Sequence, residues 1–222
     1  MQIQAYLLPD YLSLMAGSLQ LIVLLMAFYH APWRVLRLDP GRIHLVAGGA
    51  VACLVLWLIN IRTVDGLILH LLGMTTLTLV VGWSLSIIAA SLSLLVMNLL
   101  LGLDLCGYPV SWFFTVLLPA SVSSTLASLL YRPGLRNPFV YMLGAGFAGG
   151  GLVVLLVALL AVALFALTGM GNLLEVISEY WPLLLLMMFS EAFINGMCVS
   201  ALAIFFPDWL KTFDDHFYLD DA

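Results

Sequence analysis

The chain has 222 residues, of which 64% are hydrophobic and only 9% are charged, and its formal net charge is −5. A typical soluble domain is about half apolar and about a quarter charged, so this composition excludes a soluble globular enzyme and a disordered chain. Seven basic residues against twelve acidic ones also exclude a nucleic-acid-binding module. The remaining class is a helical protein that crosses a membrane several times.

Transmembrane helices are predicted from apolar runs, because a helix needs about 20 apolar residues to cross the hydrocarbon core of a bilayer. One apolar stretch, 67–102, is too long for a single crossing at about 1.5 Å per residue. Gly82, Trp83 and Ser84 lie near its middle, so we expect the stretch to break there into two short helices. The sequence therefore predicts seven helices, at about 11–30, 43–60, 67–81, 84–102, 110–131, 138–168 and 180–206.

The basic residues support this count of helices. With seven crossings, all but one of them fall on the same side, in the first loop, in the loop between the fifth and sixth helices and in the tail: Arg34, Arg37, Arg42, Arg132, Arg136 and Lys211. Only Arg62 falls on the other side, so the positive-inside rule makes the richer side cytoplasmic and places the N-terminus outside. We therefore expect an all-α, polytopic membrane bundle that forms one domain over 1–222, with an acidic cytoplasmic tail at 207–222.

Small residues are concentrated in the sixth predicted helix, which contains Gly144, Gly146, Gly149, Gly150 and Gly151. Inside a bilayer, small residues let helix backbones approach closely, and van der Waals contact then holds the helices together. Serines and threonines of the fourth and fifth helices are expected to hydrogen-bond the carbonyl one turn back in their own helix. These residues predict a compact bundle and do not by themselves indicate transport.

Glu191 lies about ten residues into the seventh predicted helix, near the middle of the bilayer. A carboxyl group there costs a few kcal/mol unless it is protonated, paired or directed into a cavity. One interpretation is a polar contact for a passing ion, together with Asn195 one turn further along the same face. The other is a structural hydrogen bond, for example to a serine of a neighbouring helix.

His70 lies one turn into the third predicted helix, just below the outer surface, and Met74 follows one turn deeper on the same face. Imidazole is the commonest protein ligand of divalent transition metals, so His70 is a candidate metal ligand. The alternative is a packed histidine bonded to a backbone carbonyl. The outer face also carries acidic residues that would concentrate cations, namely Asp10, Asp65, Asp104, Glu175 and Glu179.

Two motifs are absent from the sequence. It contains no HExxH metalloprotease motif and no glycine-rich phosphate loop followed by Lys-Ser or Lys-Thr. We therefore predict no catalytic residues, no permanently bound cofactor and no ATP hydrolysis by this chain.

Four short segments, in the same order along the chain, resemble the CbiM/NikM family, the membrane component of energy-coupling-factor transporters for cobalt and nickel. Pro9-Asp10-Tyr11-Leu12-Ser13 is similar to the opening of that family, and His70-Leu71-Leu72-Gly73 matches its His-Leu-Leu-Gly run. Ser190-Glu191-Ala192 and Pro207-Asp208-Trp209-Leu210 resemble its Gly-Glu-Ala helix and its closing Pro-Asp-Leu. The expected topology of seven helices with the N-terminus outside also fits this family.

The resemblance implies a metal site made by the N-terminal amine, a histidine at the second residue and the histidine of the His-Leu-Leu-Gly run. His70 matches the last of these, and Met1 would supply the amine. The second residue here is Gln2, and alignment on the opening motif puts Leu7 where the family has its histidine. We therefore expect the site to be weakened or rebuilt from other groups, for which the candidates are Asp10, Met74, Asp104 and Cys106.

The resemblance implies a permease component that captures a divalent transition metal, nickel or cobalt, as transported substrate. Such a subunit needs cytoplasmic ATPase subunits and a coupling membrane protein as partners, and it lies in the cell membrane of a bacterium. An alternative is a structural or assembly protein that keeps the fold and has lost the metal. A third is a membrane enzyme or haem protein that uses His70 with a second histidine.

Overall fold

The computed structural model describes residues 2–3, 9–62, 67–169, 181–214 and 217–218. Within these residues six helical segments are long and apolar enough to cross a membrane: Asp10–His30, Pro40–Leu58, Trp83–Leu101, Leu105–Leu130, Pro138–Leu167 and Trp181–Phe205. The chain therefore has the helical, membrane-crossing architecture that its composition predicts.

Most of these segments are single helices, and two are composite. The single ones are α1 (Asp10–His30), α3 (Pro40–Leu58), α5 (Trp83–Leu101) and α11 (Trp181–Phe205). One composite rod joins η2 (Leu105–Gly107), α6 (Tyr108–Trp112), the π-helical η3 (Phe113–Leu117) and α7 (Leu118–Leu130). The other joins α8 (Pro138–Val140), the π-helical η5 (Tyr141–Ala148) and α9 (Gly149–Leu167). Short helices between or after the rods are α2 (Trp33–Leu38), η4 (Pro133–Leu135) and η6 (Pro207–Trp209).

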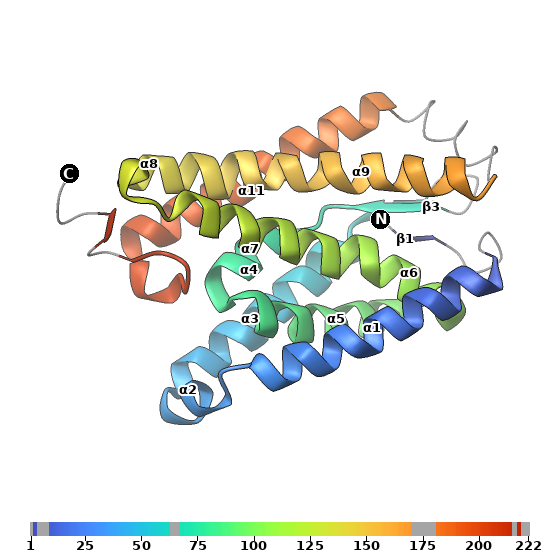
Figure 1. Ribbon diagram of the computed structural model, residues 1–222, viewed down its shortest axis with the longest axis horizontal. Helices are drawn as coiled ribbons and strands as arrows, with labels where there is room; N and C mark the ends of the chain where they lie inside the picture. Colours follow the sequence, from blue (N-terminus) through green and yellow to red (C-terminus); the bar gives the residue numbers. More distant parts are fainter. Residues whose placement is uncertain (1, 4–8, 63–66, 170–180, 215–216, 219–222) are drawn as a thin grey trace.

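A small antiparallel sheet lies at one end of the bundle, and α2 lies at the other (Figure 1). The sheet has the order β1-β3-β2, where β1 is Gln2–Ile3, β2 is Asn60–Arg62 and β3 is Leu67–His70. We call the end with this sheet the sheet end. The end with α2 and η6 is called the tail end.

The expected helix at 67–81 is wrong. Its first residues form β3, which pairs with β1 on one side and β2 on the other, and only Met74–Val81 is helical, as α4. A continuous apolar run does not distinguish a buried strand from a helix, which explains the error. Eight residues make a helix of about 12 Å, too short to cross a bilayer, so the described residues hold six spanning helices and not seven. Together, β3, its loop and α4 still lead the chain from the sheet end toward the tail end (Figure 1).

The expected break at Gly82 is confirmed. Gly82 separates α4 from α5 and has a φ of +85°, a conformation that residues with a Cβ rarely adopt. The tail that follows α11 closes the same end of α4, because the backbone N–H groups of Lys211 and Thr212 donate to the carbonyls of Val80 and Leu79. The acidic tail is therefore partly packed against the bundle.

The glycines of the sixth predicted helix pack η5 and α9 against α11, as expected. A Cβ on Gly146 would lie 3.0 Å from Cβ of Val199, and one on Gly150 would lie 2.8 Å from the carbonyl oxygen of Glu191. Gly151 has Ala192 as its neighbour across the same interface. The two backbones are therefore as close as glycine permits.

This contact predicts that Gly150→Ala destabilises the protein. The added methyl group meets backbone atoms that cannot move aside, so we expect the free energy of unfolding to fall by about 1–3 kcal/mol. Thermal unfolding in detergent, followed by tryptophan fluorescence, measures the change. Gly48→Ala on α3 is the matched control, because a Cβ there would meet nothing within 4 Å. Equal melting temperatures for the two variants would contradict the assigned packing.

Candidate functional site

The carboxylate of Glu191 binds the backbone of the loop between β3 and α4. Its side chain is 1% exposed on α11. Oε2 accepts the N–H of Leu72 at 2.7 Å, and Oε1 accepts the N–H of Gly73 at 2.5 Å. Glu191 thus makes the structural hydrogen bond that we considered, although its partners are backbone amides and not a serine.

Asn195, one turn further along α11, completes this contact. Its Nδ2 donates to the carbonyl oxygen of Glu191 at 2.7 Å and to Oε1 of the same residue at 2.9 Å. Its Oδ1 accepts the N–H of Thr76 at 2.9 Å and the hydroxyl of Thr76 at 2.7 Å. We call Glu191 and Asn195 the α11 pair.

The α11 pair takes the place of an N-cap for α4. The first N–H groups of a helix have no partner within the helix, and the N-cap residue here, Gly73, has no side chain to offer one. Asn195 Oδ1 instead accepts the N–H of Thr76 in the first turn of α4, and Glu191 accepts the N–H groups of Leu72 and Gly73 just before the helix. A carboxylate at a helix N-terminus also interacts favourably with the helix dipole.

The loop of residues 71–73 has the sequence that this contact requires. Gly73 has a φ of +64°, and a Cβ there would lie 2.9 Å from Cδ2 of Leu56. Leu72 is buried, and its carbonyl oxygen accepts the indole N–H of Trp57 at 2.8 Å. Every position of the loop is therefore fixed by a backbone or packing contact, which makes it a rigid connection between β3 and α4.

His70 is the last residue of β3 and leads directly into this loop. Its side chain is 3% exposed, its ring centroid lies 5.7 Å from that of Trp57, and its strand partner in β2 is Asn60. Nδ1 lies 2.9 Å from the carbonyl oxygen of Leu71, so this nitrogen carries the hydrogen. In a neutral imidazole, Nε2 then carries the lone pair that a metal ion needs.

The N-terminal strand runs alongside His70. In the register of the sheet, Gln2 pairs with Ile68 and Ile3 pairs with Leu67, so β1 runs antiparallel and its N-terminal end points toward His70. Met1, the other predicted metal ligand, lies outside the described residues.

Four of the predicted site residues lie on or beside the loop of residues 71–73, namely His70, Met74, Glu191 and Asn195. Met74, fully buried, is the first residue of α4 and directly follows the loop that joins His70 to the α11 pair. Both oxygens of Glu191 accept N–H groups, so this residue positions the loop.

Among the acidic and sulfur candidates, two contact each other at the sheet end of the bundle. Asp104 accepts the N–H of Cys106 at 2.9 Å at the exposed start of η2, which is a local turn contact. Within the described residues no three His, Cys, Asp or Glu side chains are grouped so that they could hold a metal ion. Three of the expected outer acidic residues lie outside the described part of the chain, namely Asp65, Glu175 and Glu179.

Sequence reasoning missed several residues that build the site. Trp57 donates to the loop, Asn60 pairs with His70 in the sheet, and Thr76 donates two hydrogen bonds to Asn195. Nothing in their residue types or spacing separates them from other residues of the apolar runs. A signal was present only for Gly73, since a glycine directly before an apolar run is a common helix boundary.

Comparisons with known proteins identify the family to which the chain belongs. The described residues form apolar helices long enough to cross a membrane, with a buried histidine at the end of the central strand of a small sheet. The chain belongs to the CbiM family, described as the cobalt uptake substrate-specific transmembrane region, which matches residues 3–209. That family is one of transport components and not of enzymes.

Two solved structures share the fold. A crystal structure of a truncated transition metal transporter has 21% sequence identity and a TM-score of 0.71, and the match covers 92% of this chain and 99% of that one. A second crystal structure, also of a transition metal transporter, has 20% identity and a TM-score of 0.69 over 92% of this chain and 93% of that one. No curated protein sequence matches the chain.

The α11 pair predicts a graded loss of stability on substitution. Glu191→Ala leaves the N–H groups of Leu72 and Gly73 without a partner, and each such group costs about 1–3 kcal/mol. Glu191→Gln keeps one acceptor oxygen and should cost less. Thermal unfolding in detergent measures both, with Ser190→Ala as the control from the same turn of α11. If Glu191→Ala unfolds at the same temperature as the control, the assigned role of the carboxylate is wrong.

Proposed function

We propose that this chain is the substrate-capturing membrane subunit of an ATP-driven uptake system for a divalent transition metal of the cobalt or nickel type. The observation that supports this most strongly is His70, a buried imidazole whose Nδ1 is bound by a carbonyl and whose Nε2 carries the lone pair. The carbonyl partner fixes the ring orientation, as it does for many metal-ligating histidines.

The direction of uptake follows from the charges. Arg34 and Arg37 lie in α2 at the tail end, and Arg132 lies next to η4. The positive-inside rule favours the cytoplasm for this end and the outside for the sheet end. His70 then meets the metal from the outer side of a bacterial cell membrane.

Roles can be divided between ligand and positioning residues. His70 coordinates the cation, and the N-terminal segment that β1 directs toward it supplies the remaining ligands, including the amine of Met1. Glu191 and Asn195 fix the loop of residues 71–73 and so fix where His70 lies. These two act through the loop and do not touch the metal.

Partners are needed because the sequence contains no nucleotide-binding motif. Uptake against a gradient requires cytoplasmic ATPase subunits, and a coupling membrane protein transmits their conformational change to this subunit. Copurification of the chain with such proteins from its own membranes is the expected result.

The second candidate function is an assembly protein that keeps the fold without the metal. Two observations favour it. Gln2 stands where the family has a histidine, and the described residues contain no group of three acidic, sulfur or imidazole side chains suited to a metal ion. This candidate predicts that substitution of His70 leaves uptake by the assembled system unchanged.

Metal binding separates the two candidates. The purified chain should bind about one equivalent of Ni²⁺ or Co²⁺ in isothermal titration calorimetry, and His70→Ala should weaken binding at least about 100-fold because it removes a ligand. His30→Ala is the control, since the His30 ring is exposed near the tail end and contacts the carbonyl of Met26 and the ring of Tyr29. Absence of binding by the unmodified chain, or equal affinity in both variants, would contradict the capture function and leave the assembly candidate.

A further inference from the structure

A large groove runs along the tail-end half of the bundle, between α3 and α11, with α4 as its floor. Its volume is about 900 Å³, and its lining is mostly apolar, with the polar residues Asp39, Arg42, His44, Thr76, Asn195 and Asp208. Small residues of α3 make one wall, among them Gly48, Gly49 and Ala52, and Cys198 and Leu202 of α11 belong to the other. Its deep end reaches Gly73 and Asn195.

The groove opens toward the hydrocarbon of the membrane. Exposed apolar side chains flank it on both helices, Val51 and Val55 on α3 and Met197 and Ile204 on α11. From Arg42 at its mouth to Cys53 near its deep end is eleven residues of α3, or about 17 Å. One leaflet of a bilayer core is about 15 Å thick. The apolar part of the groove therefore has the length of one leaflet.

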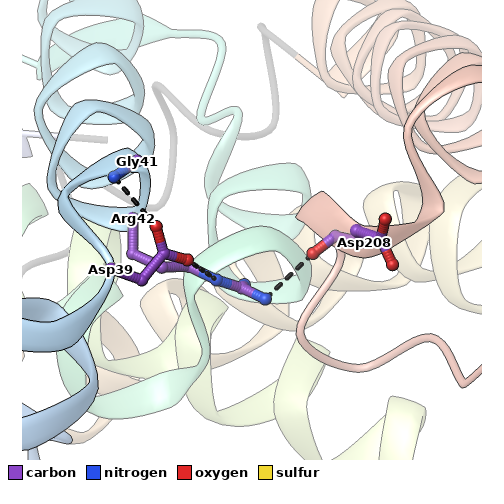
Figure 2. A network of polar contacts seen from close by, with 4 residues as sticks. All are labelled: Asp39, Gly41, Arg42 and Asp208. Atoms are coloured by element: carbon purple, nitrogen blue, oxygen red, sulfur yellow. Dashed lines mark hydrogen bonds and ion pairs between the residues drawn. The ribbon is translucent and has the colours of Figure 1, made fainter.

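A polar bridge closes the mouth of the groove. Figure 2 shows Arg42 reaching from α3 toward η6, where its guanidinium donates to the carbonyl oxygen of Asp208 at 2.9 Å. Asp39 stays on the α3 side, with Oδ2 3.7 Å from Nε of Arg42 and Oδ1 accepting the N–H of Gly41. A molecule that ends at the membrane surface can occupy the groove with the bridge intact.

The mouth presents both signs of charge. Lys211 lines a second hollow of about 520 Å³ that shares Arg42 and Asp208 with the groove. Partial burial, and after it the neighbouring Arg42 guanidinium, lowers the pKa of Lys211. In the described part of the chain, neither the ammonium group of Lys211 nor the carboxylate of Asp208 has a hydrogen-bond or ion-pair partner. The mouth and the hollow beside it thus hold the cations of Arg42 and Lys211, the imidazole of His44 and three carboxylates, those of Asp39, Asp208 and Asp214. Of these carboxylates, Asp208 is the one without a partner among the described residues.

We propose that this groove is a binding site for a zwitterionic phospholipid with a primary ammonium headgroup, of the phosphatidylethanolamine type. One acyl chain fills the apolar groove between α3 and α11. The phosphate lies between Arg42 and Lys211, and the headgroup ammonium pairs with the carboxylate of Asp208. The acyl chain then contacts both α3 and α11, which are separated by the groove, and lies on α4.

Native mass spectrometry of the purified full chain tests this site. After exchange into detergent, phosphatidylethanolamine, phosphatidylcholine and phosphatidylglycerol are added in turn at equal concentration. We expect one equivalent of phosphatidylethanolamine to be retained, at least about tenfold more than of the other two. Phosphatidylcholine shares the net charge but has no ammonium hydrogen to donate, and phosphatidylglycerol has no cation. Equal retention of the three lipids would overturn the proposal.

Charge variants test the mouth of the groove. Arg42→Gln combined with Lys211→Gln should lower phosphatidylethanolamine retention about tenfold or more. Asp208→Asn should remove the preference over phosphatidylcholine. Arg34→Gln combined with Arg37→Gln is the matched control, since it removes the same charge at the same end of the bundle outside the groove lining. A loss of lipid in the control equal to that in the Arg42 and Lys211 variant would contradict the assignment.

A groove-filling variant tests the apolar part without changing charge. A side chain at position 48 would enter open space in the groove, so Gly48→Phe should exclude the acyl chain and abolish retention. Leu25→Phe, on the exposed face of α1 and outside the groove lining, should leave it unchanged. Photocrosslinking from Cys198 in membranes completes the test. A lipid adduct supports the proposal, whereas an adduct with another protein would show that the groove holds a partner helix.

Discussion

Two backbone N–H groups in the interior of the bundle, those of Leu72 and Gly73, have the carboxylate of Glu191 as their acceptor. A carboxylate buried among membrane helices costs several kcal/mol unless its oxygens are satisfied, and amides without an acceptor are costly as well. Each group removes the penalty of the other. The contact joins α11 to a segment 118 residues earlier in the chain, so it fixes the end of β3 and the start of α4 relative to the helix bundle.

This constraint explains how a short helix can exist at the centre of the fold. Helix α4 is too short to cross the bilayer, and its N-terminus would leave unpaired N–H groups in an apolar environment. At one end, Asn195 accepts the N–H of Thr76 in the first turn, and Glu191 binds the two amides just before the helix; at the other end, the backbone of Lys211 and Thr212 donates to the last carbonyls of α4. With α4 held at both ends, β3 and its terminal His70 keep one position. A metal ligand benefits from such rigidity, because its orientation is set before the ion arrives.

The sequence predicts the parts of this fold that depend on residue type. Glu191 stands out because a carboxyl is rare in an apolar run, Gly82 because it interrupts one, and the glycines of α9 because they permit close contact. The strand β3 is missed, since its apolar residues would suit a helix equally well. The partners of Glu191 are missed for a different reason. They are backbone N–H groups, which every residue except proline has, so only the folded geometry can show which of them lie near the carboxylate.

Hydrogen exchange at the amides of Leu72 and Gly73 measures the central contact most directly. If the carboxylate of Glu191 holds both amides, they should exchange as slowly as the buried helical amides of α5, although they lie in a loop, and Glu191→Gln should accelerate them at least about tenfold. Exchange of both amides at the rate of an exposed loop in the unmodified protein would contradict the account.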